Sequence, residues 1–355
     1  MTCSVLIALF ACRGPSTVEI PSDSEDATDS QPTETGQDSG PCTPEPAEPG
    51  ESVGLSLSFD GVERRYRLHL PSDYDCSPRP LIIGLHGYYG SGQGFEESTS
   101  RMASTIDARG IIGLFPDGLP MGESGWQAQV TSFNDIDSHH SEGPDGPTCS
   151  EDAYDYGVYD NCPSEESTDA CNWGTSCADD EGFLRALIAQ VQGAWSVDAD
   201  RIYLTGFSQG GQSAQSLGSR LSDLLAAVSP QHGFATNGYT VGPESALGLF
   251  QVWGDKDRIV DGHDQPSNDG MIYDGAEETA QVWAAAQGCA ATATEYPTDY
   301  DGTRGWTCVE HAGCSTGAEV VSCVWNGGHT WGRGGGTNFA LGSMLSFFDK
   351  HERQP

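Results

Sequence analysis

The stretch "YLTGFSQGGQ", residues 203–212, decides the fold. Apolar and aromatic residues lead to Gly206-Phe207-Ser208-Gln209-Gly210, which fits the pattern G-x-S-x-G. In this pattern a strand turns sharply into a helix and exposes one serine, and the glycines let neighbouring backbones pack closely. A short Gly-rich turn would give the same letters by chance. The pattern therefore predicts a nucleophile only if a strand precedes it, a helix follows it, and an acid and a histidine lie downstream.

The segments around this stretch meet the first two conditions. Residues 180–195 repeat apolar side chains at four-residue intervals, as an amphipathic helix does, and a second such helix is expected over 210–225. Continuous apolar runs typical of buried parallel strands occupy 80–87, 111–118 and 201–208. Strands that alternate with helices predict an α/β fold, a mostly parallel sheet with helices on both faces. Ser208 would then lie at the carboxyl end of a strand, where such folds bind their ligands.

The downstream partners are Asp257 or Asp255, after the apolar run 248–253, and His329, in the strand-like segment 320–332. Serine, acid and histidine in this order are typical of α/β-hydrolases. The serine needs a base within hydrogen-bond distance, and the imidazole needs a carboxylate to hold its tautomer. A structural histidine and a surface carboxylate paired with Arg258 are the plainer interpretations of the same residues.

The oxyanion formed on attack needs two N–H donors. We expect the backbone of Gln209, directly after the serine, to supply one. The loop after "LHG" would supply the other, from Tyr88 or Tyr89.

The charge balance excludes some partners. The 355 residues include 52 acidic and 16 basic side chains, which gives a formal net charge of −36. Such a chain is repelled by nucleic acid and by anionic membrane surfaces, so neither is expected as a partner. The acidity is most simply a solubility feature.

The first fifty residues are typical of an exported protein. The apolar run 4–12 is too short to span a bilayer, and its end, Leu9-Phe10-Ala11-Cys12, resembles a bacterial lipobox, although no Lys or Arg precedes the run. Residues 13–52 are rich in Pro, Ser, Thr and acidic residues and are expected to be a disordered linker. We therefore expect a signal over 1–12 and a catalytic domain over 53–355. The protein would be secreted or anchored in the cell envelope, and its only membrane contact would be a lipid at Cys12.

The twelve cysteines favour an oxidising compartment. No C-x-x-C pair occurs, so disulfides explain the cysteines better than zinc does. The acidic segment 131–179 contains four of them and reads as an insertion on the active-site side. Its pair His139-His140 lacks the spaced carboxylates of a calcium loop, and no metal or cofactor is predicted.

Six sequence blocks together carry a family resemblance. "PLIIGLHGYYGSG", "FPDG", "DDEGFLRALI", "DADRIYLTGFSQGG", "WGDKDRIV" and "GGHTWG" resemble, in this order, those of the polyhydroxybutyrate depolymerase and feruloyl esterase group, which includes acetylxylan esterases. The resemblance runs from about residue 53 to the C-terminus. It implies an α/β-hydrolase fold and a catalytic triad of Ser208, Asp257 and His329, because the second acid of "DKD" aligns with the family's acid. It also implies a Cys289–Cys314 disulfide, and the remaining Cys308 and Cys323 lie in strand-like segments that a cross-strand disulfide could join.

The substrate is the least determined feature of the sequence. Trp126, Trp331 and Tyr89 could stack on a phenolic acyl group or a sugar ring. With a mean hydropathy of −0.42 and no apolar stripe in the sequence, feruloyl or acetyl esters of plant polysaccharides fit better than an insoluble polyester. A polyhydroxybutyrate depolymerase, a peptidase, and a catalytically silent hydrolase fold that binds glycans are the alternatives.

Overall fold

The computed structural model describes residues 46–134, 142–163, 171, 174–263 and 265–353. The chain divides into Met1–Asp38 and Ser39–Pro355, and the first of these units lies wholly outside the described residues. The expected signal, Cys12, most of the linker and His139-His140 lie outside them too. The packed fold begins before residue 53, because Ala47 is fully buried and the Gly50 N–H donates to the Leu70 carbonyl at 2.8 Å.

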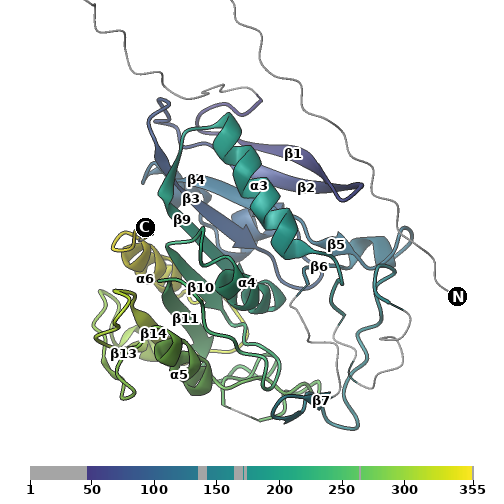
Figure 1. Cartoon of the computed structure of the whole chain (residues 1–355), viewed down its shortest axis with the longest axis vertical. Coiled ribbons are helices and arrows are strands. Elements are labelled where there is room, and N and C mark those ends of the chain that lie inside the picture. The colour runs from purple at the N-terminus through teal and green to yellow at the C-terminus, as the bar shows by residue number, and fades with distance from the viewer. Residues whose placement is uncertain (1–45, 135–141, 164–170, 172–173, 264, 354–355) are drawn as a thin grey trace, which may run out of the picture. The chain divides into compact units, whose positions relative to one another are not determined.

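A ten-stranded sheet organises the described residues (Figure 1). Its six central strands run parallel, as the sequence predicted, and two antiparallel strands extend each edge. In spatial order the strands are β1 (Ser52–Phe59), β2 (Val62–His69), β4 (Ile112–Pro116), β3 (Arg79–Leu85), β9 (Val197–Phe207), β10 (Ala227–Gln231), β11 (Gly248–Gly254), β14 (Val320–Trp325), β13 (Thr307–His311) and β12 (Thr294–Glu295). Two small hairpins lie outside it: β5 (Leu119–Pro120) with β6 (Thr131–Ser132), and β7 (Glu142–Gly143) with β8 (Gly146–Pro147).

Two apolar cores cover the two faces of the sheet. Alternate strand residues face opposite sides, so in β9 Leu204 joins one core and Tyr203 the other. The first core is closed by α3 (Asp180–Ala194), α4 (Gln209–Arg220) and α5 (Ala276–Ala286). The second is closed by α2 (Ala103–Asp107) and α6 (Phe339–Phe348). Helices on both faces and a mostly parallel sheet establish the predicted α/β-hydrolase architecture.

The helix boundaries follow local chemistry. The Asp179 carboxylate caps α3 by accepting from the Gly182 N–H at 2.8 Å, and Phe183, Leu187 and Val191 bury its apolar side. The helix expected over 210–225 is α4, which ends earlier, at Arg220. The remaining short turns are α1 (Gly92–Gly94), η1 (Phe95–Thr99), η2 (Gln127–Gln129) and η4 (Thr303–Gly305). Within the described part of the chain, no helix has the length and apolar character that crossing a bilayer requires.

Disulfides cross-link both the edge of the sheet and the insertion. Cys289–Cys314 and Cys308–Cys323 both form, as predicted, and Cys308 lies opposite Cys323 across β13 and β14. Cys149–Cys171 and Cys162–Cys177 tie the insertion to itself. The insertion has little regular structure in its described residues, so these covalent bonds replace much of the missing sheet and helix contacts.

Candidate active site

Ser208 lies on a sharp turn between β9 and α4. Its backbone has φ 60° and ψ −128°, a combination that residues other than glycine rarely adopt. The flanking glycines make the turn possible: a Cβ on Gly206 would lie 2.0 Å from the Gly210 carbonyl oxygen, and one on Gly210 would lie 2.3 Å from the His86 carbonyl oxygen. The G-x-S-x-G pattern therefore reflects backbone contacts, and Ser208 is held at the carboxyl edge of the sheet.

Three side chains that are far apart in the sequence form one hydrogen-bonded line. Ser208 Oγ lies 2.8 Å from His329 Nε2, and His329 Nδ1 lies 2.8 Å from Asp257 Oδ2. Ser208 follows β9, Asp257 follows β11 and His329 follows β14. Because these strands are parallel, their carboxyl ends meet at one edge of the sheet, which is where the sequence led us to expect the three residues.

Asp257 is fully buried, and each of its oxygens accepts two hydrogen bonds. Oδ1 accepts from the backbone N–H groups of Ile259 and Val260 at 3.0 and 3.1 Å. Burial alone would raise the pKa of Asp257, but hydrogen bonds from His232 and His329 outweigh it and leave the pKa below its ordinary value. The rival Asp255 is more than half exposed and lies beside His263, 3.4 Å from Nε2.

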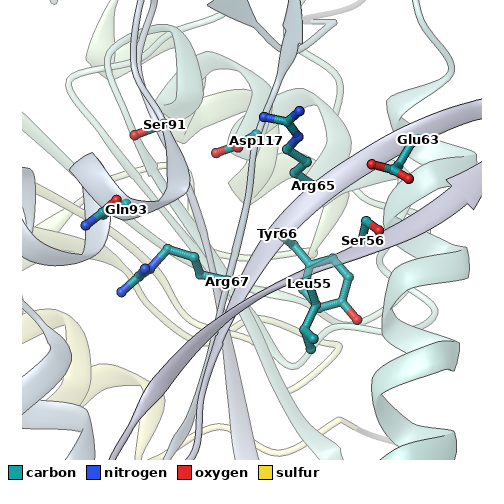
Figure 2. A pocket seen from close by; sticks show the side chains of 10 residues that line it. Leu55, Ser56, Glu63, Arg65, Tyr66, Arg67, Ser91, Gln93 and Asp117 are labelled. Carbon is teal, nitrogen blue, oxygen red and sulfur yellow. The ribbon is translucent and has the colours of Figure 1, made fainter. Parts of the chain in front are cut away.

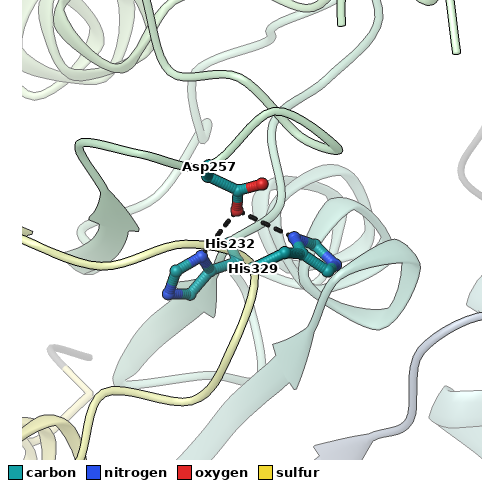
Figure 3. Close-up of side chains that lie close together, drawn as sticks. All are labelled: His232, Asp257 and His329. Atoms are coloured by element: carbon teal, nitrogen blue, oxygen red, sulfur yellow. Dashed lines mark hydrogen bonds and ion pairs between the residues drawn. The ribbon is translucent and has the colours of Figure 1, made fainter. Parts of the chain in front are cut away.

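His232 is a second histidine on the same carboxylate, and the sequence analysis missed it. Its Nδ1 lies 2.7 Å from Asp257 Oδ2, the oxygen that also contacts His329 (Figure 3). The residue directly follows β10, between the strands that position Ser208 and Asp257. A histidine immediately after a central parallel strand, in "SPQHG", was the available signal.

The donor atoms of His232, Asp257 and His329 all lie within 4.8 Å of one another, so this group is the metal-site candidate among the described residues. Its N···O separations of 2.7 and 2.8 Å are those of hydrogen bonds. A zinc ion at ~2 Å from each donor in a tetrahedral site would need to spread these atoms to more than ~3 Å apart. The arrangement therefore suits proton-sharing partners better than metal ligands.

The loop after β3 faces Ser208 from the other side. His86 Nε2 accepts from the Gly118 N–H at 2.9 Å, so Nδ1 is the protonated nitrogen and donates to the Gly87 carbonyl at 2.8 Å. Burial keeps the pKa of His86 low, which favours this neutral form. The Tyr89 N–H donates to the Thr131 carbonyl at 3.0 Å, so Tyr88 is the better-suited donor of the two predicted.

Gln209 joins this loop region through its side chain as well as its backbone. As the first residue of α4, it has an N–H without an acceptor inside the helix. Its Nε2 donates to the Phe133 carbonyl at 2.6 Å, at the start of the insertion. The sequence indicated a role only for the backbone of Gln209, and the side-chain contact ties the turn at Ser208 to the insertion.

A cavity of about 230 Å³ opens onto Ser208 and His329. Aromatic and aliphatic side chains form much of its wall, with one carboxylate: Tyr88, Tyr156, Tyr273, Ile259, Val260 and Asp269. Tyr156 comes from the insertion, packs edge-on against Tyr88 and donates to Asp269. Burial, and then the nearby Tyr154, raise the pKa of Tyr88 to about 12, so its hydroxyl stays protonated at neutral pH. The insertion thus shapes the cavity.

The other aromatic residues predicted for substrate binding lie elsewhere. Trp331 is only 2 % exposed, packs between Phe95 and Phe207, and donates through Nε1 to Asn338 at 2.8 Å. Its prediction as a substrate contact is therefore corrected, because the ring belongs to the core. Trp126 and Tyr89 are exposed and lie outside the cavity lining, and the Tyr89 hydroxyl contacts Gln129 in the short helix after Trp126.

A larger cavity, of about 700 Å³, lies over β1 and β2 (Figure 2). Its wall includes Arg65, Arg67, Glu63 and Asp117, and Arg67 is paired with Glu96 and Glu97. Neither Ser208, Asp257 nor His329 lines it. The smaller cavity is therefore the one that contains candidate catalytic residues.

Curated relatives of this chain are esterases. It is 27 % identical to feruloyl esterase B of Piromyces equi over 72 % of this chain and 40 % of that protein. It is 26 % identical to the putative esterase NocK of Nocardia uniformis subsp. tsuyamanensis over 82 % of this chain and 77 % of that protein. The probable feruloyl esterase C of Aspergillus niger is 28 % identical over 44 % of this chain and 52 % of its own length. The chain thus spans less than two thirds of both feruloyl esterases. No family model matches it.

Solved structures agree on the fold. An acetyl xylan esterase from Aspergillus awamori superposes with a TM-score of 0.55 at 12 % identity and covers 84 % of this chain and 99 % of its own. The structure titled sOPH native gives a TM-score of 0.51 at 16 % identity, over 88 % of this chain and 91 % of its own. At these identities the solved structures show a shared fold, and the curated relatives are named as two feruloyl esterases and an esterase.

Proposed function

We propose that the protein is an exported serine carboxylesterase in which Ser208 is the nucleophile, His329 the general base and Asp257 the acid. The observation that carries this proposal is the line of two 2.8 Å hydrogen bonds from Ser208 through His329 to Asp257. The relatives named as esterases support the reaction class.

In the acylation step, His329 Nε2 takes the Ser208 Oγ proton as Oγ bonds to the ester carbonyl carbon. The proton then passes to the leaving alcohol oxygen as the ester C–O bond breaks, which leaves an acyl group on Ser208. In deacylation, His329 takes a proton from water as the water oxygen bonds to the acyl carbon. The proton then returns to Ser208 Oγ as the acyl–oxygen bond breaks, which releases the acid. Asp257 keeps His329 Nδ1 protonated and stabilises the imidazolium, and its lowered pKa keeps it ionised throughout.

The oxyanion of each tetrahedral intermediate would accept from the backbone N–H groups of Gln209 and Tyr88. The free N–H at the start of α4 supports the first assignment, since the helix dipole also favours negative charge there. The engaged N–H of Tyr89 supports the second. His86 holds the loop through Gly87.

The substrate we propose is a feruloyl or acetyl ester of a plant polysaccharide. The cavity of about 230 Å³ is smaller than the ~300–1,000 Å³ typical of whole-ligand pockets, so it suits the acyl part of an ester whose alcohol part lies outside. Tyr88 and Tyr156 offer aromatic faces to a phenolic ring, and Asp269 offers an acceptor for a hydroxyl. The exposed Tyr89 and Trp126 would contact a sugar ring of the alcohol part.

Four disulfides among the described residues support an oxidising compartment. We therefore keep export, through the segment 1–12, and a lipid at Cys12 as parts of this proposal. Mass analysis of the mature N-terminus would decide between a lipidated Cys12 and a free secreted chain.

The test is a substrate panel of methyl ferulate, acetylated xylan and polyhydroxybutyrate, with Ser208→Ala as the background. We expect turnover of methyl ferulate or acetylated xylan that vanishes in the variant. Release of 3-hydroxybutyrate alone would favour a depolymerase. Cleavage of peptides without esters would favour a peptidase. Binding of xylan without hydrolysis of any ester would favour a silent glycan-binding fold.

A further inference from the structure

His232 is held rigidly below the triad. It is fully buried, its backbone N–H donates to the Val252 carbonyl at 2.7 Å, and its φ of 52° lies in the left-handed region. Such a conformation is uncommon for a residue other than glycine and costs free energy. The strained backbone aims the ring at Asp257, 2.7 Å from Oδ2.

The other ring nitrogen fixes the tautomer. Trp325 Nε1 lies 3.2 Å from His232 Nε2. An indole N–H can only donate, so Nε2 must accept and carries no proton. The proton of the neutral ring is therefore on Nδ1, where it donates to Asp257. Complete burial also lowers the pKa of His232, in agreement with a neutral ring.

The carboxylate is consequently fixed without the help of His329. His232 holds Oδ2, and the N–H groups of Ile259 and Val260 hold Oδ1. His329 is then the one imidazole on Asp257 that also contacts Ser208. The two histidine rings stand at 89° to each other, with centroids 5.8 Å apart, so each approaches Oδ2 from its own direction.

We propose that His232 is a positioning residue, whose neutral Nδ1–H, set by Trp325, holds the Asp257 carboxylate in the orientation that His329 requires. It acts through Asp257 and makes no contact with the reacting ester. This inference rests on the proposed function, because it assigns His232 to the same reaction.

The experiment compares His232→Leu with His232→Asn. Leucine fills a similar volume but removes the donor. The asparagine amide N–H replaces the donor at the Nδ1 position, and asparagine tolerates positive φ. We expect His232→Leu to lower kcat for a simple aryl acetate by ~10–100-fold with KM changed less than ~2-fold, as losses of supporting hydrogen-bond partners do elsewhere. His232→Asn should recover most of the lost kcat.

His351→Asn is the matched control. His351 is also buried, but it lies against Gly248 at the opposite end of β11 from Asp257, and its Nδ1 contacts the Phe347 carbonyl. It should lower stability without changing kcat. Thermal unfolding of every variant separates folded fraction from rate. Equal kcat losses in His232→Leu and His232→Asn, or wild-type kcat in a folded His232→Leu, would overturn the inference.

Proton NMR of the full wild-type chain, in the downfield region where hydrogen-bonded imidazole N–H protons resonate, tests the inference even if His232→Leu does not fold. We expect one imidazole N–H resonance that is lost in His232→Asn and a second that is lost in His329→Ala. Absence of the His232 signal would contradict the tautomer. Failure of the proposed function would look different, since the wild type would then hydrolyse no ester while the His232 resonance persisted.

Discussion

The turn that carries Ser208 and the insertion that carries Tyr156 line the same cavity, but different forces hold them. The turn lies between a buried strand and a helix, and its backbone packs so closely that a Cβ on Gly206 would lie 2.0 Å from the Gly210 carbonyl oxygen. The insertion is held by Cys149–Cys171, Cys162–Cys177 and isolated bonds such as that from the Tyr154 N–H to the Asp269 carbonyl. The position of Ser208 therefore depends on local backbone sterics, whereas the shape of the cavity depends on long-range cross-links that can be removed one at a time.

Breaking the triad should have the largest effect. Ser208→Ala and His329→Ala should each lower kcat for esters by ~10⁴-fold or more, because triad members act as a unit. Asp257→Asn should be similarly severe, and Asp255→Asn mild, since Asp255 is exposed and lies beside His263. Steady-state kinetics on an aryl acetate checks this. The opposite ranking of the two aspartates would move the acid by two residues.

A methyl group placed in the turn that carries Ser208 should have the next largest effect. Gly210→Ala would put a methyl group 2.3 and 2.4 Å from the carbonyl oxygens of His86 and Leu85, which cannot give way cheaply. We expect a stability loss of ~1–3 kcal/mol and misplacement of Ser208, measured by urea unfolding and kcat. Gly193→Ala in α3 is the control, because nothing lies within 4 Å of its added methyl group. It should be neutral or stabilising by up to ~1 kcal/mol, and equal damage in both variants would refute the steric account.

Removing a cross-link should affect recognition more than chemistry. The double variant Cys149→Ser/Cys171→Ser removes a cross-link from the part of the insertion that carries Tyr154 and Tyr156. We expect KM for methyl ferulate to rise by ~10-fold or more, as when an apolar contact is lost, with kcat for an aryl acetate nearly unchanged. The double variant Cys308→Ser/Cys323→Ser opens a cross-strand disulfide instead. It should lower stability by ~2–4 kcal/mol and leave KM for methyl ferulate unchanged. An equal KM change in both would show that this part of the insertion does not read the acyl group.

Lowering the pH should have the smallest effect, a loss of stability that arises at His232 and not at the tyrosines of the cavity. The pKa of His232 in the fold lies below the ~6.5 of an unfolded histidine, so below that pH the unfolded chain binds a proton that the native state refuses. Stability from this group is therefore present above pH ~6.5 and is lost as pH falls, by up to ~1.4 kcal/mol per unit. The tyrosines of the insertion side have raised pKa values and do not titrate in this range. Urea unfolding at pH 7 and pH 5 measures how much stability is lost between these two pH values. The loss should be smaller for His232→Asn than for the wild type, and an equal loss would contradict a neutral His232.

The sequence predicted what depends on strand ends and failed where contacts are long-range. Ser208, Asp257 and His329 each follow a central strand, so alternating elements predicted the edge of the sheet at which they lie, and the family resemblance chose Asp257 over Asp255. The prediction that Trp331 contacts substrate was wrong, because the nearby His329 lines the cavity while the Trp331 indole packs between Phe95 and Phe207. No local pattern distinguishes these two directions.

His232 and Asp269 were missed for a related reason. The role of His232 exists only because β10 lies between β9 and β11, an order that a linear pattern of strands does not fix. The contact of Asp269 with Tyr156 spans 113 positions and depends on how the disulfides fold the insertion back. The β-sheet pairing of Cys308 with Cys323, in contrast, joins neighbouring strands and was within reach of sequence reasoning.

Covalent labelling of the nucleophile tests the central claim most directly. The full chain is treated with an organofluorophosphonate, digested and mapped by mass spectrometry. The account predicts one modified residue, Ser208, with full loss of ester hydrolysis on labelling and a much slower reaction in His329→Ala, where the base is missing. Stoichiometric labelling of another serine, or undiminished hydrolysis after Ser208 is fully labelled, would contradict it.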